Sequence, residues 1–126
     1  MDKSKTEKLL RIISELRDPN SGCEWTKSQT SKSLLPFILE EAEEVHSAFK
    51  NKDDENLKEE LGDLLLQIVL QCKIAEENKL FSFDEVIDTL CEKLIRRHPY
   101  VFEDKRPHTL KEQREAYFRI KDLEKK

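Results

Sequence analysis

Four glutamates crowd into one otherwise apolar segment, LEEAEEVHSAF, at residues 39–49. Two of them, Glu41 and Glu44, are three positions apart, so a helix would carry both on one face about one turn apart. Glu60 and Asp63 repeat this spacing further along the chain. Carboxylates in such a setting are either a solvated helix face or a group gathered to hold something positive.

The second interpretation has a definite chemistry. Carboxylates held together repel, and each pair costs about 4 kcal/mol at ~4 Å and an effective dielectric constant of ~20. Protonation or a cation would relieve that repulsion. Carboxylate oxygens suit Mg²⁺ or Mn²⁺ better than zinc, and Mg²⁺ often links protein carboxylates to substrate phosphates. A single acidic pair usually marks a solvated face, whereas two pairs beside apolar stripes leave both interpretations open.

Helices must position these side chains, because the apolar residues recur with a helical period and no segment alternates long enough to form a strand. Two capping boxes, Ser82 with Glu85 and Thr109 with Glu112, mark helix starts. Pro99 ends a helix, because the residue before a proline disfavours helical geometry. The longest non-helical stretch is predicted at residues 17–33. We predict an all-α bundle with helices at about residues 5–16, 34–50, 54–78, 82–97 and 109–124.

The second and third of these helices are expected to pack antiparallel, since the turn between them near residues 51–54 is short. Glu60 and Asp63 border the apolar stripe of the third helix, and Glu41 and Glu44 belong to a row on the second. Four carboxylates would then face one another across the seam. The apolar stripe, which is wide enough for the middle of a bundle, consists of Leu57, Leu61, Leu64, Leu65, Ile68, Val69 and Cys72.

Composition narrows the class of protein. The chain has 126 residues, which predicts one domain over residues 1–126. The net charge is −4, from 23 basic and 27 acidic residues, and no basic tract stands out, which argues against long nucleic acid as a partner. An odd number of cysteines, three, favours a reducing cytoplasm over a disulfide framework. No apolar run is long enough for a signal peptide or a membrane span, so we expect no membrane partner.

Two groups of residues outside the acidic segments could meet a phosphate or a base. Lys93 and Arg97 are four positions apart on the fourth helix, where they could bind phosphate oxygens or simply interact with the helix dipole. Trp25 lies in the long loop, where it could stack on a nucleobase or close one end of the bundle. Lys27 follows it and could reach a base or a phosphate.

Four stretches together resemble a known family over nearly the whole chain. They are LLRIISELRDPNSGCEWTKSQT, LLPFILEEAEEV, LKEELGDLLLQIV and KLIRRHPYVF, at residues 9–30, 34–45, 57–69 and 93–102. They resemble the MazG nucleoside triphosphate pyrophosphohydrolases, which are all-α enzymes. The family motif, EExxE followed by ExxD, falls on residues 40–44 and 60–63.

The resemblance implies Mg²⁺-dependent hydrolysis of nucleoside triphosphates to the monophosphate and pyrophosphate, with Mn²⁺ as a possible substitute. Such activity would serve nucleotide-pool house-cleaning. A carboxylate that is not a metal ligand should act as general base, and Glu40 and Glu41 are both candidates. The metal ligands that the resemblance implies are Glu41, Glu44, Glu60 and Asp63.

For the substrate, the resemblance implies contacts from Lys93 and Arg97 and, in the last helix, from Tyr117 and Lys121. Family members are expected to carry Trp where this chain has Tyr117, so the role of this tyrosine is open. The resemblance also implies a homodimer in which helices of both subunits complete the bundle. The alternative function is a non-catalytic helical module that binds nucleotides or a protein. The intact set of four acids favours the enzyme.

Overall fold

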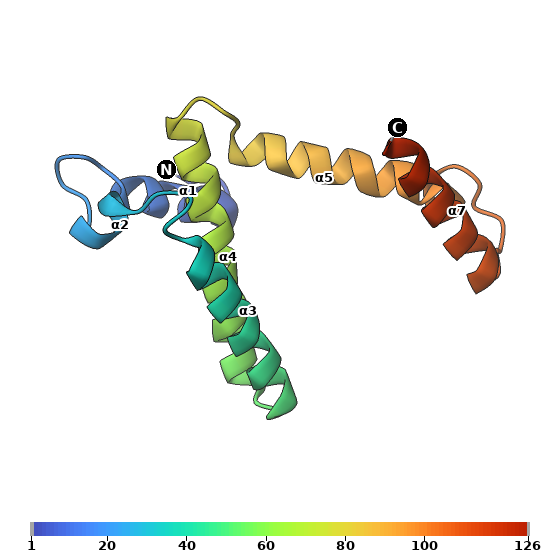
Figure 1. Cartoon of the computed structure of the whole chain (residues 1–126), viewed down its shortest axis with the longest axis horizontal. Coiled ribbons are helices and arrows are strands. Elements are labelled where there is room, and N and C mark those ends of the chain that lie inside the picture. The colour runs from blue at the N-terminus through green and yellow to red at the C-terminus, as the bar shows by residue number, and fades with distance from the viewer. Residues whose placement is uncertain (1, 126) are drawn as a thin grey trace. The chain divides into compact units, whose positions relative to one another are not determined.

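The computed structural model describes residues 2–125, and every regular element in that range is a helix. The chain divides into two compact units, residues 1–83 and 84–126, and each is described by itself. The all-α fold predicted from the sequence is confirmed. The helices are α1 (Lys5–Leu16), α2 (Glu24–Ser28), α3 (Leu35–Lys50), α4 (Asp54–Glu77), α5 (Phe83–Arg97), α6 (Pro99–Phe102) and α7 (Leu110–Glu124) (Figure 1).

Two short helices differ from the sequence expectation. The stretch predicted to be non-helical contains α2, a five-residue helix whose N-cap residue, Cys23, makes no side-chain capping bond. Pro99 does end α5, as predicted, but it also opens α6 as a first-turn residue. Proline is tolerated there because the first helical N–H groups have no partner within the helix. Neither helix is long enough to display an apolar period, so the sequence pattern could not reveal them.

The hairpin of α3 and α4 confirms the predicted antiparallel pair. The two helices lie side by side along their length, joined by a tight turn (Figure 1). Lys52 in this turn adopts a positive φ of 56°. Asp53 then caps α4, because its side chain accepts a hydrogen bond from the backbone N–H of Asn56 at 3.1 Å. The turn therefore fixes which residues of α3 face which residues of α4.

The core of this unit gathers around the C-terminal half of α4. Val69, Leu70 and Ile74 of α4 pack with Ile13 of α1 and with Leu34, which precedes α3. The middle of α4, by contrast, keeps much of its apolar stripe exposed. Only part of the stripe predicted for the middle of a bundle is thus buried within the chain. The exposed members are Leu61, Leu65 and Ile68, at 50%, 43% and 43% relative exposure.

The second unit comprises most of α5 together with α6 and α7. The predicted capping box at the start of α7 is confirmed. The Thr109 side chain accepts from the backbone N–H of Glu112 at 3.1 Å, and the Glu112 carboxylate accepts from the backbone N–H of Thr109 at 2.9 Å. The chain then returns so that the end of α7 lies beside the end of α5 (Figure 1). No helix among residues 2–125 is long and apolar enough to cross a membrane.

Arg17, just after α1, links α2 to the C-terminal end of α4. Its guanidinium forms an ion pair with Glu77 at the end of α4, with an Nη2–Oε1 distance of 2.7 Å. Its Nη1 donates to the carbonyl oxygens of Thr26 and Gln29, at 2.7 and 3.0 Å. The Arg17 side chain is only 9% exposed, so these bonds are shielded from water. One side chain therefore holds the short helix that carries Trp25.

Replacing Arg17 with glutamine is expected to lower the free energy of unfolding by about 2 kcal/mol, because charge-assisted bonds to partly buried groups are lost. Urea denaturation followed by circular dichroism measures this change. Arg11→Gln is the control: Arg11 pairs with Asp2 and Glu15 on the surface, so its loss should change stability by less than ~1 kcal/mol. Equal effects of the two substitutions would contradict this role of Arg17.

Candidate active site

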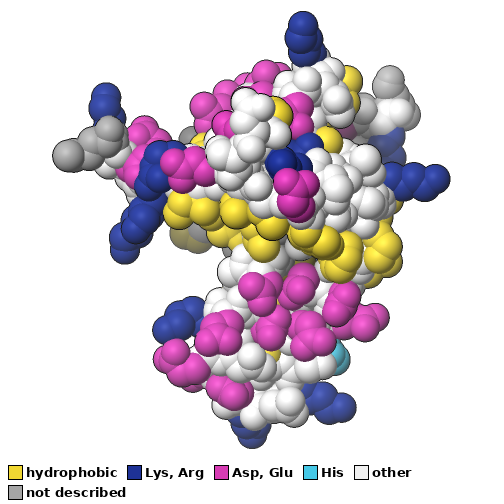
Figure 2. Space-filling model, turned by 90° about the vertical axis from the view of Figure 1, so that its left-hand side faces the viewer, with side chains coloured by type: hydrophobic (Ala, Val, Ile, Leu, Met, Phe, Trp, Pro, Cys, Tyr) yellow, Lys and Arg dark blue, Asp and Glu magenta, His cyan; other side chains and the backbone are white. Residues whose placement is uncertain are grey.

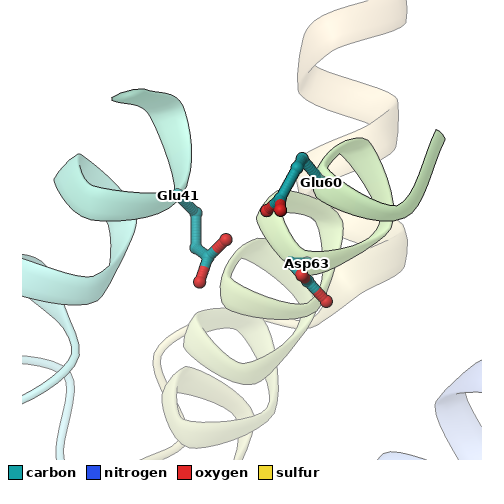
Figure 3. A group of neighbouring side chains, drawn as sticks. All are labelled: Glu41, Glu60 and Asp63. Carbon is teal, nitrogen blue, oxygen red and sulfur yellow. The ribbon is translucent and has the colours of Figure 1, made fainter. Parts of the chain in front are cut away.

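Three carboxylates meet across the α3–α4 seam. Glu41 projects from α3, and Glu60 and Asp63 project from successive turns of α4 (Figure 3). One carboxylate oxygen from each residue lies within 4.8 Å of the others. Asp63 is exposed, whereas Glu41 and Glu60 are half-buried. Three of the four carboxylates expected to face one another across the seam thus converge, namely Glu41, Glu60 and Asp63.

The protonation equilibria of this group are shifted. Burial, followed by the charge of Asp63, raises the pKa of Glu41 above its ordinary value. Burial and then the charges of Asp63 and Glu41 raise the pKa of Glu60. The interaction between the two carboxyl groups lowers the pKa of Glu41 and raises that of Glu60. The cluster therefore attracts positive charge, either protons or a metal ion.

A buried carboxylate oxygen without a hydrogen-bond partner indicates that the site suits a cation. Oε2 of Glu41 is buried and has no hydrogen-bond partner among the described residues. A buried acceptor without a partner costs free energy, and a solvated helix face does not explain it. The converging ligand atoms are all carboxylate oxygens, which suit a hard divalent ion such as Mg²⁺ or Mn²⁺. The three residues therefore fit the metal that the sequence suggested.

The other predicted acids lie beside this group. Glu44 is exposed and is not among the side chains whose oxygens converge. Its charge still raises the pKa values of Glu41 and Glu60. Glu40 is also exposed, and its charge raises the pKa of Glu41. Acidic side chains crowd the face of the α3–α4 hairpin in the lower part of the view in Figure 2. Ligation by Glu44 and base catalysis by Glu40 or Glu41 stay predictions.

In the second unit, two of the predicted substrate residues come together. Nη1 of Arg97 is 3.4 Å from the Tyr117 hydroxyl, and the guanidinium carbon lies 5.7 Å from the centre of the tyrosine ring. The same guanidinium also binds Glu124 near the end of α7. Sequence reasoning missed Glu124, although Tyr117, Lys121 and Glu124 share one face of a helix by their spacing. Lys93 and Lys121 are half-buried, and their contact with substrate stays a prediction.

Trp25 and Lys27 occupy the short helix α2. The Trp25 ring meets the Phe37 ring edge-on with centroids 5.5 Å apart, yet the residue remains 49% exposed. It thus covers one end of α3 and still offers a face to a ligand. The Lys27 ammonium binds the Glu24 carboxylate at 2.9 Å, on the same short helix. Lys27 would have to leave Glu24 to bind a phosphate.

A cavity of about 330 Å³ lies within the second unit, and it contains none of the predicted site residues. His108 on its wall contacts the backbone oxygen of Asp104 at 3.0 Å. The residues lining it are Pro99, Tyr100, Asp104, His108, Glu112, Glu115, Ala116 and Arg119.

Comparison with known proteins identifies the family. The model of the MazG nucleotide pyrophosphohydrolase domain matches residues 29–102, which include the acidic cluster, Lys93 and Arg97. The chain belongs to the MazG family. The solved structure of a MazG-related protein from Thermotoga maritima superposes with a TM-score of 0.78 at 31% identity, covering 92% of this chain and 98% of that one. The resemblance to the MazG family and the all-α fold inferred from the sequence are both confirmed.

Curated relatives agree with this assignment. A Thermotoga maritima protein named nucleoside triphosphate pyrophosphohydrolase/pyrophosphatase MazG is 48% identical over 106 residues, which cover 84% of this MazG chain and 41% of that protein. An Escherichia coli K12 protein named nucleoside triphosphate pyrophosphohydrolase is 43% identical over 101 residues, covering 80% of this chain and 38% of the relative. The chain thus spans about two fifths of the length of these curated relatives.

The raised pKa values lead to a prediction about stability. Because the folded state binds protons on Glu41 and Glu60 more tightly than the unfolded state, the stability contributed by this pair falls as the pH rises through the raised values. In EDTA, Glu60→Gln should therefore unfold at a higher temperature than the unsubstituted chain, by on the order of a few degrees near pH 7. The difference should shrink towards about pH 4, where the carboxyl groups are protonated.

Thermal melts followed by circular dichroism between about pH 4 and pH 7 measure this difference. Glu43→Gln is the control, because Glu43 is exposed on the same helix and outside the converging group. A Glu60→Gln chain that is less stable than the unsubstituted chain at every pH would show that the carboxylates do not repel one another.

Proposed function

We propose that this MazG chain hydrolyses nucleoside triphosphates to nucleoside monophosphates and pyrophosphate. The observation that carries the proposal is the convergence of Glu41, Glu60 and Asp63, with an unpartnered buried oxygen on Glu41. Membership of the family and the names of its curated relatives support the same activity. We also propose that the activity removes unwanted nucleotides in the cytoplasm. The free state of Cys23, Cys72 and Cys91 is compatible with a reducing compartment.

Glu41, Glu60 and Asp63 would hold Mg²⁺, with Mn²⁺ as a substitute, and Glu44 would complete the set from the adjacent turn of α3. When bound, the metal neutralises the carboxylates and polarises a phosphoryl oxygen. Glu40 precedes Glu41 and lies outside the converging oxygens, so its carboxylate is free to take a proton from the attacking water. We therefore propose Glu40 as the general base, although Glu41 was an equal candidate on sequence alone.

The second unit would bind the triphosphate. Arg97 offers a planar set of donors, which matches phosphate oxygens, and Lys93 stands one turn earlier on the same face of α5. Tyr117 contacts Arg97 and so would orient it, while Lys121 adds a positive charge on the tyrosine's face of α7. Trp25 would stack on the base through its exposed ring, and Lys27 would reach the base or a phosphate.

We further propose that the active form is a homodimer. Leu61 and Leu65 on α4 are 50% and 43% exposed, although they belong to the stripe that the sequence marks as core. Gly62 stands between them. Among residues 2–125, an added Cβ there would meet no atom within 4 Å outside its chain neighbours and the nearby backbone of its own helix. The described residues give no packing reason for this glycine, whereas the close approach of a partner helix would supply one. A second copy would bury the stripe.

Incubation with a mixture of nucleoside triphosphates and Mg²⁺ should release pyrophosphate, and EDTA should stop the release. Glu60→Gln should lower kcat by about 100-fold or more, because charge stabilisation by the metal is worth several kcal/mol in the transition state. Glu43→Gln should retain activity. Release of pyrophosphate is measured with a coupled pyrophosphatase assay. If no triphosphate is cleaved and EDTA leaves the melting temperature unchanged, the chain is a non-catalytic binding module instead.

The homodimer is tested by placing charge on the exposed stripe. Leu61→Glu combined with Leu65→Glu should convert the dimer to a monomer in sedimentation velocity, because burying two carboxylates in an apolar interface is unfavourable. Lys58→Glu changes the net charge by the same amount on the same helix, where Lys58 pairs with Glu55, and it should remain dimeric. An unsubstituted chain that sediments as a monomer at every concentration would contradict the proposal.

A further inference from the structure

The cations at the end of α5 are already occupied by one carboxylate. Glu124 of α7 accepts hydrogen bonds from Nε and Nη2 of Arg97 through a single oxygen, at 3.0 and 2.6 Å. Its second oxygen accepts from Nε of Arg96. Both carboxylate oxygens are therefore used, and Glu124 neutralises much of the positive charge that an incoming phosphate would meet.

The other edge of the Arg97 guanidinium, formed by Nη1 and the second hydrogen of Nη2, is partly engaged by Tyr117. Nη1 is directed at the Tyr117 hydroxyl, and the guanidinium lies over the tyrosine ring. The Arg97 side chain is 16% exposed, and the Glu124 side chain is 20% exposed. Carboxylate and phosphate oxygens use the same planar set of N–H donors, so the two anions cannot together bind the edge of Arg97 that Glu124 holds.

We propose that Glu124 is a displaceable counter-ion that competes with the phosphates of the substrate for Arg97 and Arg96. The inference rests on the proposed function, because it assumes that Arg97 binds the phosphates. The ligand that can displace Glu124 is an oligophosphate, because its several negative charges outcompete a single carboxylate for the two arginines. A ligand with a single negative charge would leave Glu124 in place. After cleavage, the return of Glu124 to Arg97 would favour release of the less charged product.

Protonation does not provide another way to free the cations. The hydrogen bonds from Arg97 and Arg96 lower the pKa of Glu124 to about 2. Glu124 therefore stays charged near neutral pH, where displacement requires a competing anion.

The test compares binding of inorganic tripolyphosphate, without metal, to the full chain and to Glu124→Gln by titration calorimetry. Glutamine keeps the shape and an acceptor oxygen but removes the charge, so affinity should rise roughly threefold to tenfold. Asp122→Asn is the matched control. It removes one charge from the same turn of α7, and the Asp122 carboxylate makes no ion pair among residues 2–125, so affinity should change by less than about twofold. Combining Glu124→Gln with Arg97→Gln should abolish the gain.

A second measurement needs no substitution. In the unsubstituted chain, tripolyphosphate should shift both the Arg97 Nε–H resonance and the Glu124 carboxyl ¹³C resonance as the ion pair opens. Equal affinities for Glu124→Gln and Asp122→Asn, or a Glu124 carboxyl signal that does not move at saturation, would overturn the inference. Neither readout requires turnover. If the chain cleaves triphosphates but shows neither the affinity gain nor the resonance shifts, the inference is wrong and the proposed function stands. If it shows both but cleaves no triphosphate, the proposed function is wrong.

Discussion

Repulsion between carboxylates on facing helices is the constraint around which this MazG chain is organised. The α3–α4 hairpin brings Glu41, Glu60 and Asp63 together, and burial makes their charges harder to tolerate. A fold that only needed a stable hairpin would place apolar side chains there. The cluster persists because the well-packed core around Leu70, at the other end of α4, holds the helices in register. Apolar packing in one part of the hairpin thus offsets the repulsion between carboxylates in another.

Each unit holds a cluster of charged side chains of one sign, acidic in the first unit and basic in the second. In the first unit the pKa values of Glu41 and Glu60 are raised and one buried Glu41 oxygen has no partner among the described residues, and a divalent cation would relieve both. In the second unit the cations at the end of α5 are held by Glu124, and the proposed incoming charge is an anion. Within each unit, charge on one set of side chains is therefore available to a ligand of the opposite sign.

Sequence reasoning succeeded where a residue's role depends on its neighbours along the helix. The capping box at Thr109 and the spacing of Glu60 and Asp63 are local signals, and both appear in the structure as expected. It failed where the partner is distant in sequence. The pairing of Arg97 with Glu124 depends on how α7 returns to α5, which no local pattern encodes. The exposure of Leu61 depends on how much of α4 a single chain can cover, and the helices α2 and α6 are too short to show a period.

The most direct test of the account is a crystal of the chain soaked in Mn²⁺, examined by anomalous scattering at the manganese edge. An anomalous peak is expected in the α3–α4 seam, within coordination distance of carboxylate oxygens of Glu41, Glu60 and Asp63. Oε2 of Glu41, which has no hydrogen-bond partner among residues 2–125, should lie beside that peak. A saturating soak that leaves the seam without a peak, with the three side chains turned apart into solvent, would contradict the account.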